Sequence, residues 1–173
     1  MEHFNVIPDG ICVAKAIGSG LPIGALISKD DLMDWEGGSH ATTFGGNPVA
    51  CVAGLAVIDV IRQERLLENA IKLGAHLMSR LKEMQKKYPI IGDVRGKGLM
   101  VGAEIVKDPD TKEFGSELSQ EIMMKCFKRG LAIITSGKST MRFVPPLVIT
   151  RDLLDAGLDV FEGVVKEVSS SAR

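Results

Sequence analysis

Two short apolar runs near the start of the chain limit the folds that are open to it. Residues 10–14 (GICVA) and 23–28 (IGALIS) are apolar almost throughout, without the alternation of a strand that has one solvated face. Such runs are typical of parallel strands that are covered on both faces. A single helix, predicted over residues 48–63, follows, and one helix cannot cover both faces of a sheet. We therefore expect this region to be the later part of a larger α/β architecture, or a partner to supply the rest.

Helix signals in the middle of the chain are clear. Asn47 followed by Pro48 is typical of an N-cap and the first position of a helix, so a helix is predicted over residues 48–63. Apolar residues then recur at helical spacing over residues 66–87, and Pro89 ends that pattern. The chain is therefore expected to continue from one helix into another.

The remainder of the chain mixes strand and helix patterns in a way that predicts a compact α/β unit. We accordingly predict two domains, residues 1–64 and residues 65–173. The elements predicted for the second domain are helices at 66–87, 116–129 and 152–168 and strands at 98–106, 131–135 and 141–144.

Composition and charge exclude several classes of protein. The 173 residues are 45% hydrophobic and 25% charged, with a net charge of −1, which is typical of a globular domain and argues against nucleic acid as a partner. No apolar stretch reaches the roughly 18 to 20 residues that a membrane span needs. The first five residues do not resemble a signal peptide. We expect no membrane partner.

The cysteines and histidines show no metal-ligand or disulfide pattern. Cys12, Cys51 and Cys126 are far apart and form no C-x-x-C motif, and the three histidines have no ligand spacing. The expectation is free thiols in a reducing cytoplasm and no metal site.

Two glycine-containing motifs resemble nucleotide sites and do not fit them. Gly137-Lys138-Ser139 matches the end of a P-loop, but Ala132 stands where the first glycine belongs, and a strand rather than a helix follows. Residues 96–102 resemble a dinucleotide fingerprint, with the third glycine one place late. We interpret the first as a polar turn and reject dinucleotide binding at the second, which precedes a strand instead of joining a strand to a helix. A lone acid such as Glu104 is interpreted as structural or solvated.

Lys15 stands at the end of the first apolar run, with three glycines and a proline after it. Burial or neighbouring cations lower the pKa of a lysine and make its amine a nucleophile. Ligand clefts lie at the carboxyl ends of strands in α/β sheets, and glycines let the backbone approach a flat ligand. Lys15 is thus a candidate for a Schiff base with a carbonyl compound such as pyridoxal phosphate (PLP). A lysine that extends its amine to the surface remains the simpler interpretation of these residues alone.

Four segments, in order, resemble one enzyme family. CVAKAIGSGLPIGALIS (12–28) is similar to the Schiff-base segment of the class III, or ω-amino-acid, PLP-dependent aminotransferases. HATTFGGNPVACVAGLAVIDVI (40–61) resembles the family's T-[FY]-x-G-N-P loop and the helix after it. IGDVRGKGLMVGAEI (91–105) and MRFVPPLVIT (141–150) resemble its small domain and its substrate-carboxylate arginine strand. The pattern is most similar to 4-aminobutyrate aminotransferases, with acetylornithine and ornithine aminotransferases as near alternatives.

This resemblance implies a fold, a cofactor and three site residues. The fold is α/β: residues 1–64 end the PLP-binding large domain of fold type I, and residues 65–173 form its C-terminal small domain. Lys15 would hold PLP and move the substrate proton, Thr43 would bind the PLP phosphate of the other subunit, and Arg142 would bind a substrate carboxylate. The implied activity moves an amino group from a 4-aminobutyrate-like ω-amino acid to a 2-oxo acid in a dimer or larger homo-oligomer.

The resemblance also identifies parts of the family's site that are not in this sequence. The aspartate that pairs with the pyridine nitrogen and the turn that holds the phosphate lie upstream of the Schiff-base segment in the family. We therefore expect the isolated chain to be an inactive C-terminal fragment whose exposed apolar faces drive self-association. The alternative is a non-catalytic remnant that serves as a structural or interaction domain.

Overall fold

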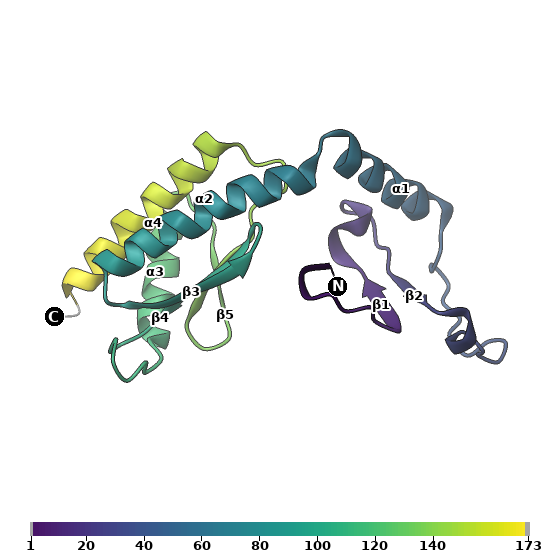
Figure 1. Ribbon diagram of the computed structural model, residues 1–173, viewed down its shortest axis with the longest axis horizontal. Helices are drawn as coiled ribbons and strands as arrows, with labels where there is room; N and C mark the ends of the chain where they lie inside the picture. The colour runs from purple at the N-terminus through teal and green to yellow at the C-terminus, as the bar shows by residue number, and fades with distance from the viewer. Residues whose placement is uncertain (1, 172–173) are drawn as a thin grey trace. The chain divides into compact units, whose positions relative to one another are not determined.

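The computed structural model describes residues 2–171 and divides the chain into two compact units (Figure 1). We call Met1–Arg65 unit 1 and Leu66–Arg173 unit 2. The elements of unit 1 are η1 (Glu2–Phe4), β1 (Gly10–Val13), η2 (Lys15–Gly18), β2 (Ala25–Ser28), η3 (Asp30–Leu32) and α1 (Pro48–Gln63). Within residues 2–171, no helix combines the length and the apolar character that crossing a membrane requires.

The two strands of unit 1 correct the expectation of buried parallel strands. β1 and β2 pair with each other in antiparallel register, from Gly10 opposite Ser28 to Val13 opposite Ala25. Their residues are exposed or half-buried, with no fully buried position. An apolar run shows that its side chains are hydrophobic, but it carries no information on strand direction. The direction is set by the path of the chain between the two strands.

Helix α1 has the predicted bounds, and its predicted cap is confirmed. The Asn47 side-chain oxygen accepts a hydrogen bond from the Ala50 amide at 2.9 Å, and Pro48 follows at the first helical position. Small residues on α1 face η2: a Cβ added to Gly54 would lie 3.5 Å from the Ile17 carbonyl oxygen. The helix therefore supports the turn that follows β1.

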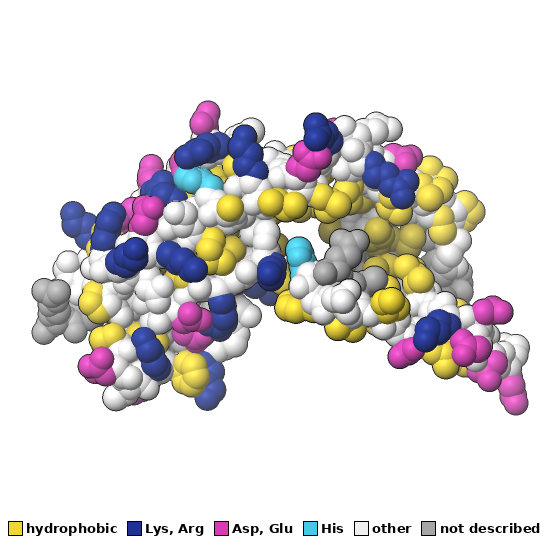
Figure 2. All heavy atoms as spheres, in the orientation of Figure 1, with side chains coloured by type: hydrophobic (Ala, Val, Ile, Leu, Met, Phe, Trp, Pro, Cys, Tyr) yellow, Lys and Arg dark blue, Asp and Glu magenta, His cyan; other side chains and the backbone are white. Residues whose placement is uncertain are grey.

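Unit 1 leaves most of its large apolar side chains in contact with solvent. Its buried residues, among those described, are only Gly18, Ala50 and Gly54. Ile7 is 90% exposed and Phe44 is 80% exposed. Figure 2 shows hydrophobic side chains at the surface of this unit. The other exposed large apolar residues include Phe4, Val6, Leu26, Ile27, Trp35, Val49, Val52 and Leu55.

Unit 2 is a four-stranded antiparallel sheet with helices on one face. The strand order is β3-β4-β6-β5. Helix α2 has the predicted bounds, and α2 and α4 lie side by side (Figure 1), joined by ion pairs from Arg80 to Asp155 and Asp159. The elements are α2 (Leu66–Lys87), β3 (Ile91–Lys97), β4 (Met100–Ile105), α3 (Ser116–Lys128), β5 (Ile134–Ser136), β6 (Thr140–Phe143) and α4 (Arg151–Ser171).

Strand β3 is missing from the sequence prediction. The segment IGDVRGK has two glycines and three charges, so its strand propensity is low. Gly98, with φ of 51°, and Leu99 form the two-residue turn that reverses the chain into β4. The strand predicted over 98–106 therefore begins at Met100, because its first two residues are the turn.

The core of unit 2 lies between the helices and one face of the sheet. Alternate strand residues, Val94, Val101, Ala103, Met141 and Phe143, are buried in a cluster with residues of α2, α3 and α4. Helix α2 also packs closely on the β3–β4 turn: a Cβ added to Gly74 would lie 2.3 Å from the Gly98 carbonyl. The opposite face of the sheet carries the remaining side chains, which include Asp93, Arg95, Met100, Glu104, Thr140 and Arg142.

Candidate functional site

Lys15 lies one residue after β1 and opens the 3-10 turn η2. Its φ of 59° is in the left-handed region, which costs a residue with a side chain about 1–2 kcal/mol. The C-terminal part of the turn is held in place: the Ser19 amide donates to the Ala16 carbonyl at 3.0 Å, and a Cβ added to Gly18 would lie 2.7 Å from Ile23 Cγ2. Strained backbone that is fixed by its surroundings is typical of functional positions.

The Lys15 side chain is available for chemistry. It is exposed, and it makes no hydrogen bond or ion pair with the residues that the structure describes. The amine is therefore accessible to an aldehyde, whereas the burial that the sequence suggested for it is not present among the described residues. Lys29, in the same unit, is different because its ammonium pairs with Asp9 at 2.7 Å.

Thr43 lies in the long connection between η3 and α1, shortly before the Asn47 cap. It is exposed, and its hydroxyl has no partner among residues 2–171. Thr43 and Lys15 both belong to unit 1. An exposed hydroxyl with no internal partner is suited to donate to an external phosphate oxygen.

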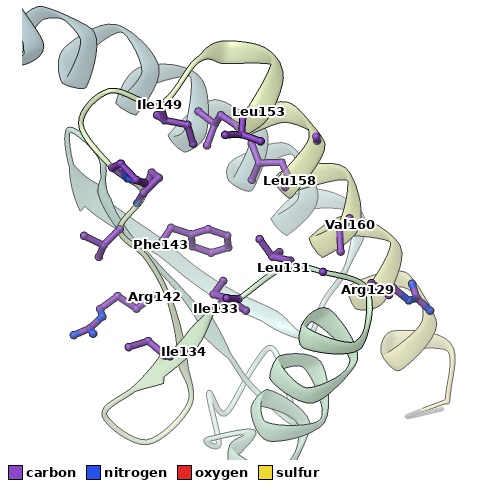
Figure 3. A pocket seen from close by; sticks show the side chains of 18 residues that line it. Arg129, Leu131, Ile133, Ile134, Arg142, Phe143, Ile149, Leu153, Leu158 and Val160 are labelled. Carbon is purple, nitrogen blue, oxygen red and sulfur yellow. The ribbon is translucent and has the colours of Figure 1, made fainter.

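Arg142 lies on β6, directly between Gly102 of β4 and Ile134 of β5. It is exposed and has no ion pair or hydrogen bond with any described residue. Figure 3 shows Phe143 directed into a pocket and the Arg142 guanidinium directed away from it. The alternation along the strand thus places Arg142 on the face that the helices leave uncovered.

The pocket beside β6 has a volume of about 610 Å³ and lies within unit 2 (Figure 3). Its lining is largely apolar and includes Leu131, Ile133, Phe143, Ile149 and Leu158. Two arginines, Arg129 and Arg142, also belong to the lining, although Figure 3 shows the Arg142 guanidinium directed away from the pocket. The apolar part of this lining is suited to apolar groups.

A hydrogen-bonded charge network beside Arg142 was missed by the sequence analysis. Arg95 pairs with Asp93 at 2.8 Å and with Glu104 at 2.7 Å. The buried Ser139 hydroxyl donates to Glu104 at 3.0 Å. Burial raises the pKa of Glu104, but hydrogen bonds from Arg95, Ser139 and Thr140 outweigh it and lower that pKa.

The network could have been detected only by recognising β3 as a strand. Asp93, Arg95 and Lys97 then alternate on one face, next to Glu104. The GKS motif, Gly137-Lys138-Ser139, is the β5–β6 connection, as its interpretation as a turn predicts, and Ser139 is its buried residue. No group of three or more candidate metal-ligand side chains occurs within the described part of the chain.

Comparison with known proteins identifies the family. The model of the class III aminotransferases matches residues 1–165. The chain belongs to the class III aminotransferase family. This family depends on PLP, and the computed α/β structure agrees with solved aminotransferases: it superposes on a Bacillus anthracis aminotransferase with a TM-score of 0.88, 31% identity and 96% of this chain covered. The ornithine δ-aminotransferase of Plasmodium falciparum gives a TM-score of 0.86 at 34% identity, with 98% covered.

The curated relatives have several activities. The chain is 39% identical to the acetylornithine aminotransferase of Caldanaerobacter subterraneus over 96% of its length, and 44% identical to the leucine/methionine racemase of Thermococcus litoralis over 97%. It is 38% identical to a probable 4-aminobutyrate aminotransferase of Bacillus subtilis over 94%. These similarities do not identify 4-aminobutyrate as the substrate of this chain.

The chain is short beside its relatives. It spans 40%, 38% and 38% of the length of those three curated relatives, and 40% and 42% of the two solved chains. The residues that it contributes include Lys15, whose amine has no partner among the described residues. What the whole site binds is therefore a matter for proposal.

Proposed function

We propose that this chain contributes the covalent cofactor attachment and a substrate-carboxylate site to a PLP-dependent aminotransferase. Lys15 holds the cofactor, Thr43 of one subunit binds the cofactor phosphate of its neighbour in a homodimer, and Arg142 binds a carboxylate of the substrate. The amino group moves from an ω-amino acid such as 4-aminobutyrate to a 2-oxo acid. A cytoplasmic location is part of the proposal, supported by the three free cysteines. Residues 1–64 belong to the large domain and 65–173 to the small domain.

The chemistry asked of these residues is simple. Bound PLP supplies an electron sink for the pair released when a bond to the substrate carbon breaks. The Lys15 amine would accept the proton from that carbon and would donate it again later in the reaction. The planar guanidinium of Arg142 offers two parallel N–H donors to a carboxylate and fixes the orientation of the substrate.

One observation carries the proposal: Lys15, separated from β1 only by Ala14, has a strained left-handed backbone and an amine with no partner among the described residues. Four other described residues with side chains, Asn5, Ser19, Arg65 and Lys112, also have positive φ, so the strain supports the proposal only together with the unpartnered amine. The place of Lys15 within the segment matched by the family model adds to this.

Reductive trapping tests the attachment. The chain is incubated with PLP, reduced with borohydride, digested and examined by mass spectrometry. We expect the pyridoxyl group on Lys15, with no label there in Lys15→Ala. Lys29→Ala is the matched control, since Lys29 is exposed in the same unit and should not change the labelling of Lys15. Labelling spread evenly over surface lysines would contradict the proposal.

A chimera tests the substrate. The chain replaces the corresponding 40% of the Caldanaerobacter acetylornithine aminotransferase, and amino donors are compared with 2-oxoglutarate as acceptor. We expect turnover of 4-aminobutyrate, and loss of that turnover in Arg142→Gln at unchanged cofactor content. Preference for acetylornithine or ornithine would favour the alternative aminotransferases, which the relatives support equally.

A second function deserves the same test because of the 44% identity to a leucine/methionine racemase. A racemase uses the same proton removal by lysine but returns the proton to the same carbon, without a 2-oxo acid. The chimera is given L-leucine in D2O and no acceptor. Deuterium at the α-carbon of both enantiomers would support racemisation, whereas formation of a 2-oxo acid only when an acceptor is added would support transamination.

A further inference from the structure

The exposed face of the unit 2 sheet places two arginines on either side of a glycine. Arg95 of β3 and Arg142 of β6 are each paired directly with Gly102, which lies on β4 between them. In the next row of the same face, Asp93, Glu104 and Thr140 are paired across the same three strands. Gly102 has no side chain to separate the two guanidinium groups.

Glu104 is placed diagonally to both arginines. Its direct partners are Asp93 and Thr140, so Arg95 and Arg142 are each two residues further along the neighbouring strands. Diagonal neighbours on one face of a sheet are about 7–8 Å apart, which is within reach of long side chains. The register thus gives the Glu104 carboxylate two possible arginine partners.

In the structure, Glu104 binds only one of these two arginines. Glu104 binds Arg95 at 2.7 Å, and its other oxygen accepts from the buried Ser139 hydroxyl at 3.0 Å. Arg95 is held in turn by Asp93 at 2.8 Å. Arg142 has no ion pair with any described residue, although a carboxylate is within diagonal reach.

We propose that Arg95 is a positioning residue that keeps Arg142 free for an anionic ligand by holding Glu104 away from it. The identity of that ligand as a substrate carboxylate rests on the proposed function. The competition between the two arginines for Glu104 does not, because it follows from the strand register and the observed ion pairs. Removal of Arg95 leaves Arg142 as an arginine within diagonal reach of Glu104 on the neighbouring strand.

Arginine reactivity measures this competition without any enzymatic assay. Phenylglyoxal modifies guanidinium groups, and an ion pair slows the modification because it stabilises the charged form. The full chain is treated with phenylglyoxal, and modification of Arg142 is followed by mass spectrometry of the peptide that contains it. In Arg95→Gln we expect Arg142 to react about two- to fivefold more slowly, the range that an exposed ion pair supports.

The double variant separates this effect from a general disturbance. In Arg95→Gln/Glu104→Gln, Arg142 should regain its original rate, whereas structural damage would not be rescued by a second substitution. Arg95→Lys, which keeps the charge, should leave Arg142 fast. Asp93→Asn is the matched control, since Asp93 also binds Arg95 but is not a diagonal neighbour of Arg142.

Three outcomes would overturn the proposal. They are an unchanged Arg142 rate in folded Arg95→Gln, a slowed rate that the double variant does not restore, and a rise beyond about twofold in Glu104→Gln alone, which would mean that Glu104 already shields Arg142. The last variant keeps the proposal testable if Arg95→Gln does not fold.

Protection of Arg142 by 2-oxoglutarate is a separate measurement. Absence of protection in the wild-type chain, with the Arg95 effect intact, would contradict the carboxylate role under the proposed function and leave the competition for Glu104 established.

Discussion

The two units of the chain treat their apolar residues in opposite ways. Unit 2 buries large side chains such as Leu77, Ile105 and Phe161 completely between three helices and one face of a sheet. Unit 1 buries only two glycines and an alanine among its described residues, while Phe44 and Ile7 remain exposed. Apolar burial is the main favourable term in folding, so unit 2 has its own source of stability and unit 1 has apolar surface that is suited to contact with other protein.

The largest expected difference between the units is independent folding. A fragment of residues 66–173 should unfold cooperatively in urea, because it contains the whole core cluster. A fragment of residues 1–65 should show no cooperative transition, bind a hydrophobic dye and form oligomers. Circular dichroism and sedimentation measure both. A monomeric, cooperatively folding 1–65 fragment would break the comparison.

Thiol reactivity should separate the units next. Cys12 is exposed on β1, whereas Cys126 is buried in unit 2, where burial raises the pKa of its thiol to about 11. Because the thiolate is the reactive form, iodoacetamide should label Cys12 rapidly and Cys126 only when unit 2 unfolds. Mass spectrometry at increasing urea concentrations gives the two rates. Early labelling of Cys126 would show that the core of unit 2 opens easily.

Truncation of one leucine in α2 and one in α1 should have different effects on the free energy of unfolding. Leu77 of α2 is 0% exposed, and Leu77→Ala should lower the free energy of unfolding by about 2–5 kcal/mol. Leu55 of α1 is 64% exposed, and Leu55→Ala should change it by no more than about 0.5 kcal/mol. Urea unfolding of the full chain, followed by the helical signal, measures both. Equal effects of the two substitutions would contradict the difference in burial.

The smallest expected effect is the dependence of the stability of unit 2 on acidic pH. Burial opposes ionisation of Glu104, but its hydrogen bonds lower its folded-state pKa below the unfolded value of roughly 4.3. Its carboxylate therefore stabilises unit 2 above that unfolded value, and the contribution is lost as the pH falls through the lower folded pKa. Glu104→Gln should be less stable than wild type at pH 7, with a gap that narrows in acid. Asp9→Asn, in the exposed Lys29–Asp9 pair of unit 1, is the control and should have little effect at either pH.

Local signals predicted the helices better than the strands. The bounds of α1 and α2 follow from the Asn47–Pro48 start and from apolar spacing, both of which are short-range features. Strand β3 was not predicted, because its glycines and charged residues have low strand propensity. Its charged side chains lie on the solvated face of the sheet. The prediction that β1 and β2 are parallel strands was wrong, because strand pairing depends on a partner strand that a local sequence pattern does not identify.

The candidate residues divide in the same way. Lys15, Thr43 and Arg142 could be selected from segments that resemble a family, and their roles remain predictions. That Lys15 has left-handed backbone, and that its amine has no partner among the described residues, could be learned only from the structure. Glu104 was interpreted as an ordinary acid because its partners Arg95 and Ser139 are distant in sequence.

The sequence by itself determined the limits of α1 and α2, the cap on α1, the membership of a family and the residues worth testing, because each depends on neighbours along the chain or on whole segments. Only the tertiary structure decided which apolar residues are covered, which strands pair, and which arginine Glu104 binds. Those outcomes depend on strand register, and register brings residues 95, 104, 139 and 142 onto one sheet through hydrogen bonds between strands rather than through any local preference.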